Sequence, residues 1–146
     1  MSGKCFVDTN VLVYAQDRTA GVKYDVARQL LRELWESRQG VLSTQVIQEF
    51  CATLLRKIPR PLDYGAVVEA LDDYIRWEMV VNTPQAALEA LRLQQRHQLS
   101  FWDALIVRSA QVAGAEVLYS EDMSHGQRYG SVRVINPFFD HSTSIA

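Results

Sequence analysis

The order in which apolar patterns follow one another is the feature that most restricts the fold of this chain. Short apolar runs, each suited to a buried strand, alternate with longer segments in which apolar residues recur with a helical period. This alternation is typical of strands joined by crossover helices around a parallel sheet. The 146 residues show no linker, repeat or low-complexity segment, so we expect an α/β fold and a single domain spanning residues 1–146.

Both kinds of segment can be placed along the chain. The candidate strands are residues 4–7, 41–43, 79–81, 117–119 and 132–135. The helical patterns cover residues 22–35, 46–58, 64–75, 84–91 and 101–113. Gly40 is expected to end the first helix and Pro59 the second. Asp63, Thr83 and Ser100 stand at the N-cap positions of the last three.

Composition restricts the compartment more than the function. Hydrophobic residues make up 48% and charged residues 22%, close to the average for a soluble globular protein. No apolar run approaches the roughly 18 residues that cross a bilayer, and an acid comes too early for a signal peptide. Cys5 and Cys51 lack zinc-type spacing and are interpreted as free thiols. We therefore expect a cytoplasmic protein with no membrane partner.

Two acids come at the ends of predicted strands. Asp8 directly follows the first strand, and Asp122 lies just past Tyr119, where another strand ends. In open parallel sheets, sites form in the crevice outside the carboxyl ends of the strands. The two acids, far apart in sequence, are therefore expected at one edge of the sheet. Alternatively, each could cap a turn, as Asp often does.

Two further acids lie on helices. Asp103 begins a helix that is apolar nearly all round, where a carboxylate is costly unless it is paired, hydrogen-bonded or bound to a cation. A cap by Ser100, three residues earlier, is compatible with either role. Glu49 lies far from the apolar face of its helix, a pattern that predicts a solvated side chain. It could still reach the sheet edge, because helical side chains lean toward the helix N-terminus.

Four carboxylates gathered at one place would raise one another's pKa values and destabilise the fold. Hard divalent cations relieve that repulsion, and an all-oxygen ligand set suits Mg²⁺ or Mn²⁺. The sequence shows no His–Cys cluster with zinc spacing and no glycine-rich phosphate loop. The residues therefore predict an acidic, metal-binding cleft in an α/β domain, and they leave its substrate open.

Four motifs, in order along the chain, closely resemble the PIN domain. They are residues 8–14 (DTNVLVY), Ser43-Thr44 followed by Glu49-Phe50, residues 101–106 (FWDALI) and residues 118–123 (LYSEDM). Residues 124–127 and 134–138 are also similar to that family, so the resemblance covers a core from about residue 4 to 138, with a short C-terminal tail. An Asp-Thr-Asn tripeptide is common, but four motifs in order, each with its expected secondary structure, are specific.

The resemblance implies a three-layer α/β/α sandwich with a central parallel sheet of about five strands. It also implies an acidic pocket that binds Mg²⁺ or Mn²⁺. The residues that match the family's metal-site acids are Asp8, Glu49, Asp103 and Asp122. Ser120 matches its small hydroxyl residue two before the last acid, and Asn10 matches its polar residue near the first.

Within the family, the compact chain is similar to the toxin of a VapBC-type toxin–antitoxin pair. That likeness implies an endoribonuclease that forms homodimers, cleaves structured RNA and is held inactive by an antitoxin. In this hypothesis metal-activated water hydrolyses the phosphodiester, and Asp8 and Asp103 are the principal metal ligands. Asp122 and Glu49 complete the shell or orient the water.

Two other functions are weighed against this one. A PIN-like domain could bind metal and assemble with a partner without nuclease activity. A phosphatase of the haloacid-dehalogenase type also begins with an acid after its first strand. It needs a second acid two residues later, where this chain has Asn10.

The net charge of −2 argues mildly against a nucleic-acid substrate, so RNA contact would depend on local basic groups. Arg56 and Lys57 cluster at one helix end, and Arg92 and Arg96 are four apart on another. A solvated helix face is the alternative for both clusters. An apolar surface around residues 67–75 could serve dimerisation.

Overall fold

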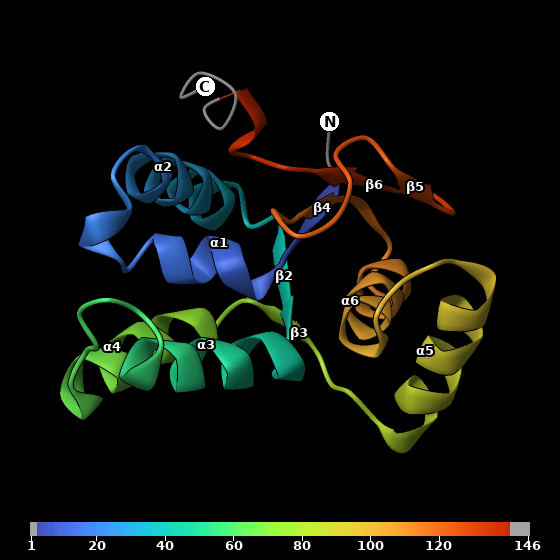
Figure 1. Ribbon diagram of the computed structural model, residues 1–146, viewed down its shortest axis with the longest axis horizontal. Coiled ribbons are helices and arrows are strands. Elements are labelled where there is room, and N and C mark those ends of the chain that lie inside the picture. The colour runs from blue at the N-terminus through green and yellow to red at the C-terminus, as the bar shows by residue number, and fades with distance from the viewer. Residues whose placement is uncertain (1–2, 141–146) are drawn as a thin grey trace.

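In the computed structural model, which describes residues 3–140, one six-stranded sheet forms the centre (Figure 1). Its strands are β1 (Lys4–Val7), β2 (Gly40–Ser43), β3 (Glu78–Val80), β4 (Ala115–Tyr119), β5 (Arg128–Tyr129) and β6 (Val132–Ile135). They lie in the order β3-β2-β1-β4-β6-β5, and every pair is parallel except β5 with β6. The predicted five-stranded parallel sheet is confirmed. The short edge strand β5 was not predicted, because two residues carry no periodic pattern.

Helices cover both faces of this sheet. They are α1 (Thr9–Tyr14), α2 (Val22–Ser37), α3 (Thr44–Arg56), α4 (Tyr64–Tyr74), α5 (Pro84–Arg96) and α6 (Phe101–Val112), with a 3₁₀ turn at Arg18–Ala20. Figure 1 shows α1 to α4 on one side of the sheet and α5 and α6 on the other. The three-layer α/β/α sandwich is therefore confirmed. The α1 helix was not predicted, since six residues are too few to show a helical period.

Most helices begin where the sequence indicated. The Ser100 hydroxyl accepts from the backbone N–H of Asp103 at 3.1 Å, and the Asp63 carboxylate accepts from Ala66 N–H at 2.9 Å. Thr83 occupies the N-cap position of α5, but its side chain makes no capping hydrogen bond. Pro84 at the first position of α5 supplies the start signal instead.

The prediction that Gly40 ends the first helix was wrong. Arg38 takes the left-handed conformation at the end of α2, with φ of 58°, and Gly40 opens strand β2. A Cβ atom on Gly40 would lie 2.0 Å from the indole ring of Trp77. Glycine is needed there because the ring approaches the strand backbone closely.

The central strands are the most buried part of the fold. Phe6, Val7 and Leu118 are fully inaccessible, and the predicted burial of α6 holds from Ala104 to Val107, although Trp102 is 60% exposed. No helix within residues 3–140 is long and apolar enough to span a membrane. Most of the predicted C-terminal tail, residues 141–146, lies outside the described residues.

The strand order reverses at β1, and this reversal determines where a site can form. The chain runs outward from β1 through β2 to β3 and then returns to the other side of β1 as β4. Val7 and Tyr119, the last residues of β1 and β4, are register partners. The crevice at a reversal of this kind is the usual ligand site of open α/β sheets.

Candidate active site

Asp8 lies in this crevice, directly after β1. It is 5% exposed, and its backbone N–H donates to the carbonyl of Tyr119 at 2.9 Å. One carboxylate oxygen accepts from the backbone N–H of Thr9 at 2.8 Å, and the other accepts from the hydroxyl of Ser120 at 2.7 Å. Asp8 is thus both the N-cap of α1 and a group fixed from β4. The capping alternative raised from sequence is correct, and it is compatible with a place in the site.

Asn10 and Ser120 tie Asp122 to the same crevice. The Asn10 side-chain amide donates to a carboxylate oxygen of Asp122 at 3.0 Å, and its carbonyl accepts from the backbone N–H of Glu121 at 3.3 Å. The Ser120 hydroxyl, which donates to Asp8, accepts from the backbone N–H of Asp122 at 3.2 Å. One hydroxyl therefore connects the first acid with the loop that carries the last.

The interpretation of Glu49 as a solvated side chain was wrong. Glu49 is half-buried, and one of its carboxylate oxygens accepts from the hydroxyl of Thr9 at 2.8 Å. The helix pattern misled because α1, which supplies Thr9, packs against α3 on the flank that a helical wheel treats as open to solvent. The sequence analysis did not identify Thr9 as the partner of Glu49, although Thr9 follows Asp8 in the first motif, residues 8–14.

Asp103 reaches the crevice from the other layer, in the first turn of α6. It is half-buried, and burial is the largest cause of a raised pKa for its carboxyl group. The negative charges of Asp122 and Glu49 raise that pKa further, while a hydrogen bond with Ser100 lowers it. Asp103 is therefore within electrostatic range of Asp122 and Glu49, with no hydrogen bond joining them among the contacts described.

The charge of Asp8 is the most strongly disfavoured in the site. Burial raises the pKa of its carboxyl group from 3.8 to about 7, and the charges of Asp122 and Asp103 add to the shift. The hydrogen bonds from Ser120 and Thr9 act in the opposite direction but do not cancel it. Near neutral pH the site thus holds a carboxylate that a cation would stabilise.

The residues fit a divalent cation in chemistry, although they do not yet converge on one. Within residues 3–140, no three Asp, Glu, His or Cys side chains form a group close enough to hold an ion. All candidate donors are carboxylate oxygens, the kind that Mg²⁺ and Mn²⁺ prefer. Thr9 engages one carboxylate oxygen of Glu49, and Asn10 engages one of Asp122. Among the contacts described for residues 3–140, the second oxygen of each carboxylate has no donor and can accept from a ligand.

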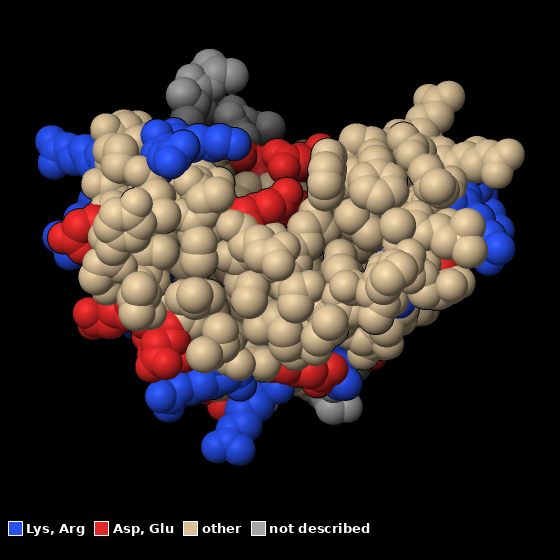
Figure 2. Space-filling view, turned by 90° about the horizontal axis from the view of Figure 1, so that it is seen from below, with Lys and Arg blue, Asp and Glu red and all other residues tan. Residues whose placement is uncertain are grey.

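A groove of about 460 Å³ extends from these acids along α1 and the end of α3. Its lining includes Thr9, Asn10, Tyr14, Glu49, Lys57 and Asp122. Lys57 thus lies in the same groove as two of the acids, whereas Arg56 is exposed and does not line it. Figure 2 shows Asp and Glu side chains in a hollow of one face, with Lys and Arg side chains beside it.

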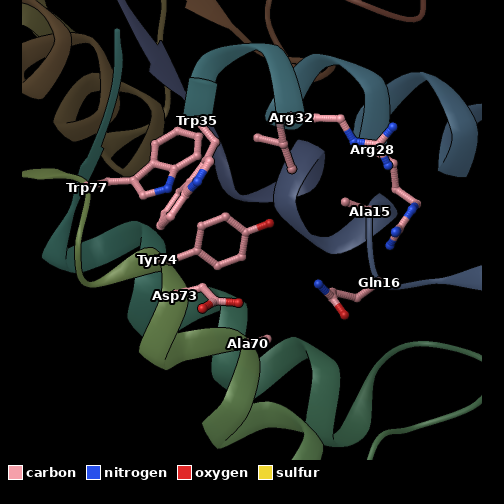
Figure 3. Close-up of a pocket in the computed structure, with 10 residues that line it drawn as sticks. Ala15, Gln16, Arg28, Arg32, Trp35, Ala70, Asp73, Tyr74 and Trp77 are labelled. Carbon is pink, nitrogen blue, oxygen red and sulfur yellow. The ribbon is translucent and has the colours of Figure 1, made fainter. Parts of the chain in front are cut away.

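A second groove, of about 390 Å³, lies between α2 and α4 (Figure 3). Trp35, Tyr74 and Trp77 form its aromatic side, with ring centroids of Trp35 and Trp77 6.4 Å apart. Arg28 and Arg32 of α2 border it as well. We call it the aromatic groove. The groove was not predicted from sequence. Trp35 belongs to the apolar helical pattern of residues 22–35, yet its side chain is 49% exposed and lines the groove.

The model of one protein family, described as the PIN domain, matches residues 5–128. The chain belongs to the PIN domain family. The sequence resemblance is thereby confirmed over most of its extent. Of the four acids named from the motifs, Asp8 interacts electrostatically with Asp103 and Asp122, and Asp103 interacts with Asp122 and Glu49. No curated protein matches the chain in sequence.

Solved structures share the fold at low sequence identity. The sarcin–ricin-loop-cleaving toxin VapC20 of Mycobacterium tuberculosis matches with a TM-score of 0.64 and 21% identity, over 82% of this chain and 90% of that one. A toxin–antitoxin complex from Klebsiella pneumoniae gives 0.61 and 19%, over 92% and 98%. VapBC2 of Rickettsia felis, bound to a DNA fragment from its promoter, gives 0.62 and 18%, over 90% and 97%.

The raised pKa of Asp8 predicts how stability depends on pH in metal-free protein. Between pH 3.8 and about 7 the unfolded chain loses the Asp8 proton while the folded protein keeps it, so the free energy of unfolding falls as pH rises. Above about pH 7 Asp8 is charged in both states, and the full loss of unfolding free energy remains. Since one pKa unit corresponds to about 1.36 kcal/mol, Asp8→Asn should gain up to about 4 kcal/mol over the parent near pH 8 and nothing near pH 3.

Urea denaturation of both proteins in EDTA, at several pH values, measures this difference. Carboxyl groups that do not interact with Asp8 titrate equally in both proteins and cancel in the comparison. A stability difference between parent and Asp8→Asn that does not grow with pH would show that Asp8 keeps an ordinary pKa.

Proposed function

We propose that this chain is a metal-dependent endoribonuclease and the toxin of a type II toxin–antitoxin pair. The observation that carries the proposal is the buried Asp8 carboxylate at the strand reversal, bordered by further acids from α3, α6 and the loop after β4. Such a site is costly for the fold unless it binds a cation. Membership of the PIN domain family and the fold shared with VapC toxins support the substrate class.

Asp8 and Asp103 would hold Mg²⁺ or Mn²⁺, and Asp122 and Glu49 would complete the shell or orient water. When bound, the ion supplies Lewis-acid activation of water and stabilises charge on a phosphodiester. Ser120 and Thr9 hold Asp8 in one orientation, so its oxygens need little rearrangement when the site is loaded.

Three side chains then position the substrate and the remaining acids. Thr9 holds Glu49, and Asn10 holds Asp122, each through one carboxylate oxygen on the wall of the groove. Lys57 supplies positive charge in that groove and would attract an RNA phosphate. Strands β1 and β4 pair in parallel and end at register partners, so the residues that follow them lie at the same crevice.

Asp8→Asn should lower RNA cleavage on the order of 100-fold or more while the protein stays folded, because the substitution removes a metal ligand and relieves repulsion. Asp72→Asn is the control, since Asp72 is an exposed acid on α4 that pairs only with Arg76 among the contacts described. Cleavage of total RNA with Mg²⁺ or Mn²⁺, with and without EDTA, measures the effect. Equal cleavage by parent and Asp8→Asn would contradict the assignment. Metal binding without any cleavage would favour the interaction module instead.

Charge reversal of Arg56 and Lys57 together should weaken RNA binding and reduce its salt dependence. If both contact phosphates of single-stranded RNA, the slope of log affinity against log salt should fall by about 1.4. The matched control reverses Arg92 and Arg96, which lie on α5 in the opposite layer. Fluorescence anisotropy with the Asp8→Asn protein measures binding without cleavage. A slope unchanged in the first variant and reduced in the second would move the RNA path to α5.

The aromatic groove is the proposed binding site of an antitoxin segment. It offers two arginines and three aromatic rings, which suit a partner segment with acidic and apolar side chains. α1 connects this groove with the acids, because Asp8 caps its first turn and Ala15, at its end, lines the groove. The toxin–antitoxin complex among the similar structures supports an antitoxin as the partner.

A homodimer is proposed on the exposed side of α4. Tyr64, Val68 and Ile75 recur there at helical spacing and are 76%, 64% and 52% exposed, a stripe that water contacts in a single chain. The sequence pointed to an apolar surface around residues 67–75; of that segment Val68 and Ile75 are exposed and belong to the stripe, whereas Val67 and Tyr74 are buried.

Light scattering tests the homodimer, and co-expression tests the antitoxin groove. The parent should elute at twice its mass of 16.6 kDa, and Val68→Glu should elute as a monomer with an unchanged circular dichroism spectrum. Co-expression with small proteins encoded beside the chain should give a complex that no longer cleaves RNA and that Arg28→Glu weakens. A monomeric parent, or an inhibitory complex indifferent to Arg28→Glu, would refute the corresponding surface.

A further inference from the structure

We propose that Glu121 is a positioning residue that anchors the Asp122 loop to α1 and α2 and so keeps Asp122 at the acid crevice. The inference rests on the proposed function, because it assigns a role in metal binding and cleavage. Glu121 stands between Ser120 and Asp122, two residues of the site, yet its own side chain turns to a different set of partners.

The carboxylate of Glu121 is held from two helices. One oxygen accepts from the hydroxyl of Tyr14, at the end of α1, at 2.7 Å. The other forms an ion pair with the ammonium group of Lys23, in the first turn of α2. Both oxygens are thus engaged away from the acids, so Glu121 is no metal ligand in this arrangement. We call Glu121, Tyr14 and Lys23 the loop clamp.

Lys23 of the loop clamp packs against two aromatic rings, those of Tyr14 and Phe138. The Lys23 ammonium lies 5.0 Å from the ring centroid of Tyr14 and 5.8 Å from that of Phe138. These two rings meet edge to face at 5.1 Å, and Phe138 is fully buried. The side chains of Lys23 and Glu121 are only 31% and 21% exposed, so water screens their attraction less than at an open surface.

The backbone of the Asp122 loop is held by the hydrogen bond from Ser120 N–H to the carbonyl of Ile135 and by the buried side chain of Met123, and the loop clamp adds an anchor toward α1 and α2. Asp122 is exposed, and its carboxylate is held by the amide of Asn10. Asn10 in turn accepts from the backbone N–H of Glu121, so the position of Glu121 determines the spacing between α1 and the last acid. Loss of the clamp would allow the loop to move away from Asn10 while Asp8, fixed by Thr9 and Ser120, stays in place.

An ion pair elsewhere supplies a matched control. Arg108 on α6 and Glu89 on α5 pair at 2.7 Å, with side chains 12% and 38% exposed. This pair joins two helices, as the clamp joins a loop to two helices, but neither residue contacts any of the four acids in the interactions described. Its loss should cost a similar amount of stability without moving the site.

The test compares the substitutions Glu121→Gln, Lys23→Met, Lys23→Arg and Glu89→Gln in the full chain. Three quantities are measured: kcat and KM for a fluorescent RNA, the Kd for Mn²⁺ by titration calorimetry, and the Tm. Glu121→Gln and Lys23→Met should lower kcat about 10-fold and raise the Mn²⁺ Kd about 10-fold, with KM for RNA changed less than about 2-fold. Lys23→Arg keeps the ion pair and should match the parent, as should Glu89→Gln apart from its Tm.

The outcomes separate the clamp from the function. If Glu121→Gln and Lys23→Met lower only the Tm, as Glu89→Gln does, the clamp is structural and the inference is overturned. Should one of them fail to fold, Tyr14→Phe removes a single hydrogen bond, keeps the ring and must show the same kcat and Kd changes in smaller measure. A parent that binds Mn²⁺ but cuts no RNA refutes the proposed function, while the calorimetry still tests the clamp. A parent that binds no Mn²⁺ refutes both.

Discussion

The buried carboxylate of Asp8 is the constraint on which the rest of the site depends. Burial raises its pKa to about 7, so at neutral pH the fold carries a group whose charge the interior disfavours. Two donors, the hydroxyl of Ser120 and the backbone N–H of Thr9, hold it in one orientation without cancelling that cost. In the proposed function a bound cation would recover the energy that burial removes.

The sheet and α1 together bring Glu49 and Asp122, which are held by few contacts, toward the rigidly held Asp8. The sheet reverses direction at β1, so that β4 returns beside it and the ends of both strands meet. Asp8 is set by the strands, whereas Glu49 and Asp122 are set by single hydrogen bonds from Thr9 and Asn10 on α1. The six-residue α1 therefore organises the site from its first turn, and its last residue, Tyr14, extends the same control to the Asp122 loop.

The proposed RNA substrate is compatible with an acidic chain because of where the charges lie. A net charge of −2 would disfavour RNA if charge were spread evenly, yet Lys57 lies in the groove that contains Glu49 and Asp122. Cation binding at the acids would reverse the local sign, and Lys57 would then act beside it rather than against it. The aromatic groove lies at the far end of α1, so the proposed partner would contact the same helix without occupying the acids.

The sequence by itself determined the α/β fold, the five parallel strands and the PIN resemblance, because apolar period and motif order are local properties of the chain. It also placed Asp8 and Asp122 at one sheet edge, since parallel strands end on one side. Only the tertiary structure decided the rest. Glu49 faces the site because α1 covers its flank, Gly40 belongs to a strand because Trp77 lies against it, and Glu121 gains a role from partners distant in sequence. Such contacts join elements whose relative placement no periodic pattern records.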